Sequence, residues 1–159
     1  MKAPKASRPN IPDYGISKSK KGMLPWKWAA DRIVKSRQYW VATVRSDGSP
    51  HVMPVWGVWL QNAFYFSTGR QTRKARNLAS NPRCVICSED SAQAVIVEGN
   101  ASELKESKKL AEVAKVYKKK YKVDVSAMDS PIYWVRPSIA FGLFEKKFPT
   151  TATRWKFDS

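Results

Sequence analysis

Short runs of apolar residues, some alternating with polar ones, recur along this chain, a pattern typical of β-strands. The clearest run covers residues 39–45, which are mostly aromatic or β-branched, and Asp47-Gly48 after it favours a tight reversal. Further runs predict strands over residues 51–60, 63–67, 83–88, 94–104, 138–144 and 151–157. Because most of these runs are joined by short turns, we expect an antiparallel meander.

Three other segments repeat apolar residues at the spacing of one helix face. The first begins at Pro25, and the others cover residues 72–80 and 106–121. On the first, the shared face holds Trp26, Ala29, Ala30, Ile33 and Val34. On the last, lysines oppose an apolar face formed by Leu110, Val113, Ala114, Tyr117 and Tyr121.

A series of hairpins closes most easily into a barrel, because closure removes exposed strand edges. The sequence therefore predicts an α+β fold, a small antiparallel split β-barrel of about seven strands with flanking helices. We expect one such domain over residues 25–159. Residues 1–24 hold prolines and glycines among lysines and serines, which predicts an irregular basic arm.

The net charge of +16 is concentrated in two segments. Residues 1–21 hold six Lys or Arg and one acid, and residues 105–122 hold eight Lys and two Glu. Such a surface favours solubility, and it also attracts polyanions such as nucleic acid, anionic lipid or a phosphorylated ligand. Charge alone leaves these interpretations open.

No run approaches the roughly 18 apolar residues of a membrane span, and the first 21 residues lack the apolar stretch of a signal peptide. We therefore expect a cytoplasmic protein without a membrane partner. Cys84 and Cys87 form a C-x-x-C pair within a predicted strand, where positions three apart face opposite sides. With one histidine and no third cysteine, no metal site is expected, and the cysteines are interpreted as buried structural residues.

The segment from residue 64 to 77 carries the most chemistry. A strand ends at the hydroxyl of Thr68, Gly69 allows a sharp turn, and Thr72 stands where a helix N-cap belongs. Arg73 and Lys74 then occupy the first helical turn, where the helix dipole disfavours cations. A bound anion would offset that cost, and the donors together resemble a phosphate cradle. An ordinary surface helix start, with both cations solvated, explains the charge pattern equally well.

The segment from residue 47 to 59 predicts an interrupted strand. Pro54 cannot donate a ladder hydrogen bond, which indicates an edge strand or a bulge whose backbone could bond a planar heterocycle. Trp56 and Trp59 supply apolar walls nearby. His51 is the only histidine, a weak candidate for a catalytic or ligand-contacting group. Because no second histidine or paired acid completes a hydrolytic site, a cofactor would have to supply the chemistry.

Three motifs occur in an order that resembles the pyridoxamine 5'-phosphate oxidase-like superfamily. They are T-x-R-x-D-G-x-P-H-x-x-P-V-W from Thr43, Y-F-x-T-x-x-x-x-R-K-A-R-N-L-x-x-N-P-R from Tyr65, and V-x-V-E-G-x-A from Val95. The resemblance spans residues 28–104, with an echo at residues 152–157. The P-V-W version is most similar to the flavin/deazaflavin oxidoreductase branch, which includes users of coenzyme F420.

This resemblance implies a split-barrel homodimer with two cofactors at the subunit interface. Arg73 and Lys74 would then hold the cofactor phosphate, with hydroxyls from Thr68 and Thr72. Gln93 would reach the cofactor from the other subunit. Further contacts to the ring or substrate would come from His51, Val52, Met53, Pro54, Val55, Trp56, Arg154 and Trp155.

The sequence also departs from the biosynthetic oxidases. They carry a basic residue where His51 stands, a lysine where Trp56 stands, and an R-L-x-P ending that this sequence does not show. We therefore do not expect pyridoxamine phosphate oxidase activity. FMN is the preferred cofactor because the phosphate cradle alone suffices for it, and coenzyme F420, whose polyglutamyl tail suits the lysines, is the alternative.

The leading hypothesis is an oxidoreductase that moves a hydride between this cofactor and a small organic substrate. A second is a flavin-binding protein without turnover, which would use the same cradle. A third is a nucleic-acid binder that uses the lysine-rich helix around residues 118–120, with steeply salt-dependent affinity. The aromatic residues alternate with aliphatic ones in strand patterns, which is typical of a core and disfavours the third hypothesis.

Overall fold

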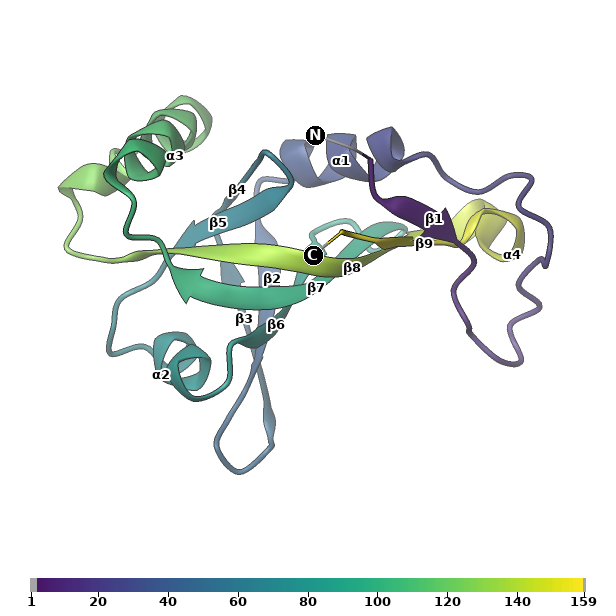
Figure 1. Ribbon diagram of the computed structural model, residues 1–159, viewed down its shortest axis with the longest axis horizontal. Helices are drawn as coiled ribbons and strands as arrows, with labels where there is room; N and C mark the ends of the chain where they lie inside the picture. Colours follow the sequence, from purple (N-terminus) through teal and green to yellow (C-terminus); the bar gives the residue numbers. More distant parts are fainter. Residues whose placement is uncertain (1–2, 159) are drawn as a thin grey trace.

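The computed structural model describes residues 3–158, whose strands form one antiparallel sheet of nine strands with helices packed against it (Figure 1). The predicted α+β class is confirmed. The strands are β1 (Lys5–Ser7), β2 (Tyr39–Val44), β3 (Pro50–Val55), β4 (Val58–Leu60), β5 (Ala63–Ser67), β6 (Arg83–Ser88), β7 (Gln93–Glu103), β8 (Ile132–Phe144) and β9 (Thr153–Lys156).

The sheet curls because β8 is long enough to pair with different strands along one edge. Its first residues pair with β5 and its later residues with β9, while β7 pairs along the other edge. The main path runs β1-β9-β8-β7-β6-β2-β3, and β4 joins through β5. Among the described strands, β3 and β4 each have one partner, so the barrel closes only partway there.

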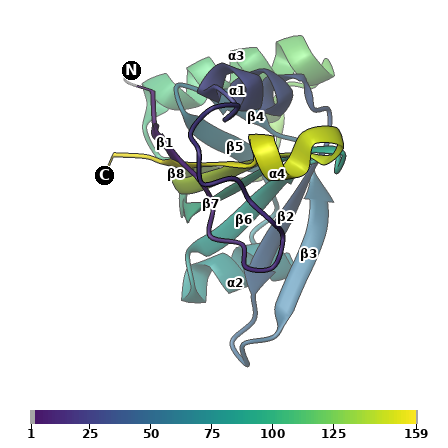
Figure 2. The same cartoon turned by 90° about the vertical axis from the view of Figure 1, so that its right-hand side faces the viewer.

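The helices are α1 (Trp26–Lys35), α2 (Arg73–Ser80), α3 (Ser107–Tyr121) and α4 (Phe148–Thr151), with 3-10 turns η1 (Val125–Ala127) and η2 (Glu145–Lys147). Helices α1 and α3 lie on one side of the strands and α2 on the other, where it leads into β6 (Figure 1). In the perpendicular view, β3 forms an edge, and its hairpin with β2 projects from the body (Figure 2).

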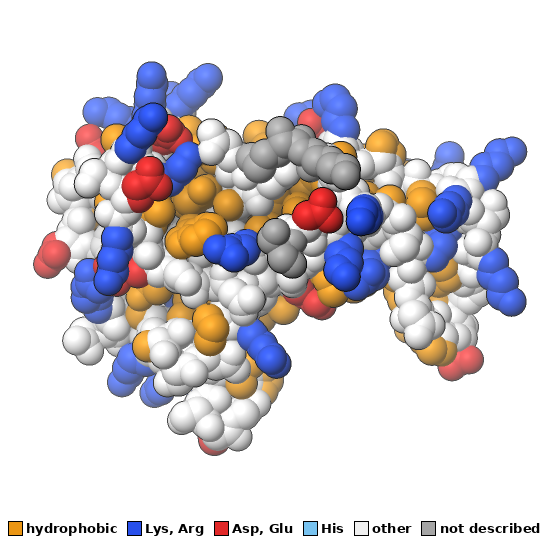
Figure 3. All heavy atoms as spheres, in the orientation of Figure 1, with side chains coloured by type: hydrophobic (Ala, Val, Ile, Leu, Met, Phe, Trp, Pro, Cys, Tyr) orange, Lys and Arg blue, Asp and Glu red, His pale blue; other side chains and the backbone are white. Residues whose placement is uncertain are grey.

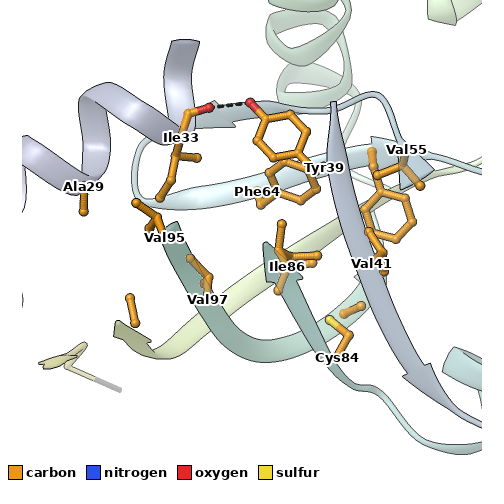
Figure 4. Close-up of a cluster of buried hydrophobic side chains, with 14 of the residues drawn as sticks. Ala29, Ile33, Tyr39, Val41, Val55, Phe64, Cys84, Ile86, Val95 and Val97 are labelled. Atoms are coloured by element: carbon orange, nitrogen blue, oxygen red, sulfur yellow. Dashed lines mark hydrogen bonds between the residues drawn. The ribbon is translucent and has the colours of Figure 1, made fainter. Parts of the chain in front are cut away.

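The core fills the space between the curled strands and α1. Strand alternation directs Tyr39, Val41, Ile86, Val95 and Val97 into it, and Figure 4 shows them converging. The Tyr39 hydroxyl is buried there and donates a hydrogen bond to the Ile33 carbonyl of α1.

A second cluster lies between α3 and the strands β4 and β5. Val113, Tyr117 and Tyr121 are the buried residues of the predicted apolar face of α3, which is therefore confirmed. Because β5 contributes side chains to both clusters, its residues Ala63 to Phe66 are all buried.

The structure corrects four details of the sequence interpretation. The predicted strand 51–60 is two strands, β3 and β4, separated by Trp56 and Gly57, and Gly57 passes too close to Phe64 to carry a side chain. Strand β8 begins at Ile132 rather than at residue 138. Val34, placed on the buried face of α1, is 53% exposed. Residues 3–158 form nine strands rather than about seven.

A fifth difference involves the basic arm, which is not irregular throughout. Its residues 5–7 form β1, which pairs with β9. Arg8 then donates hydrogen bonds to the carbonyls of Ser19, Lys21 and Ala152, at 2.6–2.9 Å. One guanidinium therefore holds two parts of the arm against the C-terminal strand.

Candidate functional site

Two threonine hydroxyls meet at the corner between β5 and α2. Thr68 follows β5 and is buried, and its hydroxyl lies 2.9 Å from that of Thr72. Thr72 is the N-cap of α2, as the sequence indicated, and its Oγ1 accepts a 3.2 Å hydrogen bond from the Ala75 amide. A 3.0 Å bond from the Thr72 amide to the Gly69 carbonyl closes the turn. The corner is thus preorganised by its own local hydrogen bonds.

Arg73 and Lys74 follow directly, as the first residues of α2. Arg73 is exposed, whereas Lys74 is half-buried, and burial lowers the pKa of its ammonium group below the ordinary value. Within residues 3–158, neither side chain forms a salt bridge. A half-buried cation without a carboxylate partner is destabilised by desolvation, and a bound anion would relieve that cost.

The remaining cation of the loop, Arg70, has a different role. Its guanidinium makes two parallel hydrogen bonds to the Glu103 carboxylate, at 2.8 and 2.9 Å. This pair joins the turn before α2 to the end of β7. Arg70 is therefore already neutralised.

The donors at this corner fit a phosphate group. The first amides of a helix have no acceptor within it, and among residues 3–158 no hydrogen bond uses the amides of Arg73 and Lys74. Two amides, two hydroxyls, a guanidinium and an ammonium are donors of the kind that bind a phosphate dianion. Asp129 also lines the space of about 590 Å³ beside residues 69–72, and is the one carboxylate among its lining residues.

The predicted ring-binding strand lies at the edge of the sheet. Strand β3 pairs with β2 alone among the described strands, so its other edge carries free backbone groups. The edge position expected from Pro54 is confirmed. By register, Val52 and Pro54 share the outer face with Trp40, whereas His51 and Met53 lie on the inner face with Val41 and Thr43, and Val55 is buried.

His51 is connected to the cradle helix through the core. Its Nδ1 lies 3.5 Å from the Thr43 hydroxyl, and that hydroxyl accepts a 2.9 Å hydrogen bond from the Asn77 amide of α2. Burial, followed by the positive charges of Arg45, Lys74 and Arg73, lowers the pKa of His51 below its ordinary value. Both effects favour the uncharged imidazole, which lies within the field of the cradle cations.

Sequence reasoning missed Thr43 and Asn77, although both are almost fully buried. Each is a polar residue on the inward side of its element, Thr43 within a strand and Asn77 next to Leu78. A polar residue at a core position needs a partner, and that rule was the available signal.

Trp56 lies where β3 ends and before β4 begins. Its indole stacks on the Tyr121 ring, with centroids 4.9 Å apart and an interplanar angle of 7°. The Tyr117 hydroxyl donates a 2.7 Å hydrogen bond to the Trp56 carbonyl. Its side chain is still 41% exposed, which suits the predicted apolar wall.

Three predicted site residues lie away from this corner. The side-chain oxygen of Gln93, Oε1, accepts hydrogen bonds from the Arg32 guanidinium, and its side-chain amide nitrogen donates to the Asp90 carboxylate at 3.4 Å. Trp155 is 1% exposed and packs in the core against Trp26. Arg154 is half-buried on β9, a strand separated from β3 by β8, β7, β6 and β2.

The two cysteines are free thiols on opposite faces of β6, as strand alternation predicted. Cys84 is buried, and burial raises the pKa of its thiol to about 12, which makes the thiolate scarce at neutral pH.

Within the described residues, no helix is long and apolar enough to cross a membrane.

The outer face of β2, β3 and β6 is apolar and open. Trp40 is 47% and Val52 52% exposed, and the register places Cys87 beside Trp40 and Val85 beside Ala42 on this face. A hollow of about 380 Å³ continues it toward β7. An apolar surface of this kind is typical of an interaction site.

Several solved structures have a similar fold. An F420 reductase is 23% identical, with a TM-score of 0.56 over 69% of this chain and 93% of that one. A FAD-binding protein from Mesorhizobium loti is 16% identical, with a TM-score of 0.63 over 82% and 94%. HutZ, the heme storage protein from Vibrio cholerae, is 20% identical, with a TM-score of 0.57 over 70% and 86%. These similarities establish the fold alone.

No protein of curated function matches the sequence. The model of the pyridoxamine 5'-phosphate oxidase family matches residues 27–141, which include the corner, the edge strand and most of the barrel. The resemblance inferred from the three motifs is thereby confirmed, and so is the split barrel. The chain belongs to the pyridoxamine 5'-phosphate oxidase family.

Proposed function

We propose that this protein is an oxidoreductase that binds FMN, or alternatively coenzyme F420, in a homodimer and acts on a small organic substrate. The observation that carries the proposal is the unpaired, half-buried ammonium of Lys74 at a preorganised helix start. Together with Arg73 and the hydroxyls of Thr68 and Thr72, it would hold the cofactor phosphate. The family match and the flavin- and F420-related neighbours support this assignment.

The edge of β3 would hold the ring. Alternate residues among 52–55 direct their backbone groups to that open edge, and the neutral His51 can donate a hydrogen bond from Nε2. When bound, the cofactor would supply hydride transfer, and the protein would supply orientation and a fixed field of positive charge. Trp155 would not contact the cofactor, because its ring is buried in the core.

The homodimer would use the open apolar face that carries Trp40 and Val52. A second copy would cover these side chains, which otherwise remain in water. Arg154 and Gln93, which lie apart from the corner within one protomer, would contribute through the partner. The partner's Gln93 would keep the orientation that Arg32 gives it here.

The choice between the cofactors depends on the lysines. Figure 3 shows Lys and Arg side chains over α3 and over the end of the molecule that carries the basic arm. Several lysines of α3 are already engaged: Lys109 pairs with Glu112, Lys118 with Asp124, and Lys120 donates to Tyr39 and Gly57. These contacts weaken the case for a long anionic tail or a nucleic acid on α3, and FMN remains preferred.

The test is titration of the purified protein with FMN and with F420, followed by absorption and fluorescence. The double variant Arg73→Ala with Lys74→Ala should weaken FMN binding by about 100-fold, because two charge-assisted hydrogen bonds are lost. Arg76→Ala is the matched control, since Arg76 is an exposed cation one turn further along α2. If the double variant binds both cofactors like the wild type, the proposal fails.

A flavin-binding protein without turnover would bind equally well. The heme storage protein among the structural neighbours shows that this fold also serves storage. The two roles differ in turnover of the bound cofactor. The test is whether a reduced nicotinamide nucleotide reduces the cofactor and an organic acceptor then reoxidises it. Cofactor binding with no reoxidation by any organic acceptor would assign storage instead.

A further inference from the structure

A pocket of about 290 Å³ lies between the cradle corner and the segment that links α3 to β8. One wall is the end of β5, another is Trp56, and the third comes from the buried face of α3 with the residues after it. Small-molecule sites begin at roughly 300 Å³, so the pocket suits a compact organic molecule. Its lining residues are Trp56, Ser67, Thr68, Gly69, Tyr117, Val123, Val125, Met128 and Ser130.

The lining contains no charged side chain, in contrast to the adjoining corner. The nearby cations Arg37 and Lys120 lie against the Trp56–Tyr121 stack and are not among the lining residues. An ionised ligand would lose its hydration here without gaining a counter-charge, which is costly. The pocket therefore favours an uncharged molecule.

The flat wall of the pocket is fixed in place. Tyr121 covers one face of the Trp56 indole, and the Tyr117 hydroxyl holds the Trp56 backbone. The indole lines the pocket and keeps 41% of its surface exposed, so part of it is available for stacking. A rigid aromatic wall of this kind favours a planar ligand in offset-stacked geometry.

Ser130 supplies a hydroxyl that can recognise an oxygen of the ligand. Thr68 and Thr72 bond each other, and Ser67 donates to the Pro131 carbonyl at 3.2 Å. Among the hydrogen bonds of residues 3–158, the Ser130 hydroxyl has no partner, and it lies about 4.0 Å from the place of a Gly69 Cβ. Ser130 can therefore pair with one carbonyl or hydroxyl of a ligand.

We propose that this pocket binds the organic substrate, an uncharged planar molecule that stacks on Trp56 and pairs one oxygen with Ser130. That the ligand is a substrate rests on the proposed function; the pocket and its preference for a neutral planar molecule do not. Its contact with the corner through Thr68 and Gly69 places the ligand next to the proposed cofactor.

The experiment uses 2-naphthol as probe and 2-naphthoate as its charged counterpart, with calorimetry and ligand-observed NMR. We expect 2-naphthol to bind and 2-naphthoate to bind at least about tenfold more weakly. Met128→Trp, which fills the pocket from an exposed position, should weaken 2-naphthol binding by more than about tenfold. Val34→Trp adds the same indole at an exposed site on α1 and should leave it unchanged.

Ser130→Ala should weaken 2-naphthol binding by about five- to tenfold and leave naphthalene binding unchanged. Equal affinity of wild type and Met128→Trp for 2-naphthol, or equal affinity for the neutral and charged probes, would overturn the proposal. Loss of 2-naphthol binding at saturating FMN would also overturn the proposal, because the pocket would then belong to the cofactor site.

Failure of the proposed function gives a different result. In the Arg73→Ala, Lys74→Ala double variant, FMN binding should fall while 2-naphthol binding stays at the wild-type level. If neither FMN nor F420 binds the wild type but 2-naphthol binding follows the expected pattern, the oxidoreductase proposal falls and the pocket assignment stands as a ligand site.

Discussion

The side-chain amide of Asn77 donates a 2.9 Å hydrogen bond to the hydroxyl of Thr43, and both groups are buried. This bond joins the helix that begins at the cradle to the strand beside the proposed ring site. Because Thr43 accepts from Asn77, its own hydrogen is free to point at His51 Nδ1, 3.5 Å away. That arrangement favours the tautomer in which Nε2 carries the proton.

The first prediction is that Thr43 sets the tautomer of His51. In the wild type, we expect the Nε2–H form to dominate above the pKa of His51, which lies below its ordinary value because of burial and the nearby cations. Thr43→Val should give a mixture of tautomers, whereas Thr43→Ser should keep the wild-type form. Nitrogen-15 NMR reads this directly, since His51 is the only histidine. A wild-type spectrum for Thr43→Val would show that the Thr43 hydroxyl does not set the tautomer of His51.

The second prediction follows from Lys74. In the free protein, burial lowers the pKa of its ammonium group, and a bound phosphate dianion would raise it again. Binding should then take up a proton as the pH approaches and passes the free-state pKa of Lys74. FMN affinity is expected to be full below that pKa and to fall above it, by up to about tenfold for each pH unit.

The measurement is FMN affinity by calorimetry from about pH 7.5 to about pH 10. Lys74→Arg provides the control, because a guanidinium does not titrate in this range. Its affinity should stay level where that of the wild type declines. The same decline in both proteins would show that another group is responsible.

The third prediction tests self-association. Trp40→Glu places a charge on the open apolar face, where a second copy would bury it. It should raise the dissociation constant of the dimer by at least about a hundredfold. Val34→Glu introduces the same charge at an exposed position on α1 and should leave the dimer intact. Sedimentation equilibrium gives the dissociation constants. A monomeric wild type at micromolar concentration would rule out this interface.

Local patterns were sufficient to predict much of the fold. Strands β5 and β6 begin and end where their apolar runs do, and the N-cap of α2 is Thr72 as its hydroxyl and position indicated. The start of β8 could not be read in the same way, because Arg136 and Pro137 interrupt its apolar pattern. The structure accommodates them with a register shift opposite Glu98 and Gly99.

The site divides in the same manner. The cradle lies within one short segment, so its residues were visible as a motif. The link from Asn77 to His51 crosses three elements, and the pocket wall at Val125, Met128 and Ser130 comes from a segment with no motif of its own. Contacts between distant segments depend on how the sheet curls, which residue spacing does not encode.

The last prediction tests the close packing at Gly57, which lies between β3 and β4. A Cβ on Gly57 would lie 2.1 Å from Cζ of Phe64, whose side chain is fully buried, and 2.9 Å from the Tyr65 carbonyl oxygen. Neither neighbour can move freely, since one belongs to the core and the other to β5. We expect Gly57→Ala to lower the free energy of unfolding by about 3 kcal/mol, at the upper end of overpacking effects.

Gly69→Ala is the matched control for this loss. Its Cβ would meet its nearest atom at 3.7 Å, which is ordinary contact, so we expect a change within about 1 kcal/mol of zero. Urea unfolding of both variants gives the comparison. Because Gly57 also accepts hydrogen bonds from Lys120 and donates to the Tyr121 hydroxyl, its displacement would shift the stack that carries Trp56. Gly57→Ala should therefore also weaken 2-naphthol binding, whereas equal stability of the two variants would contradict the close packing of Gly57 against Phe64.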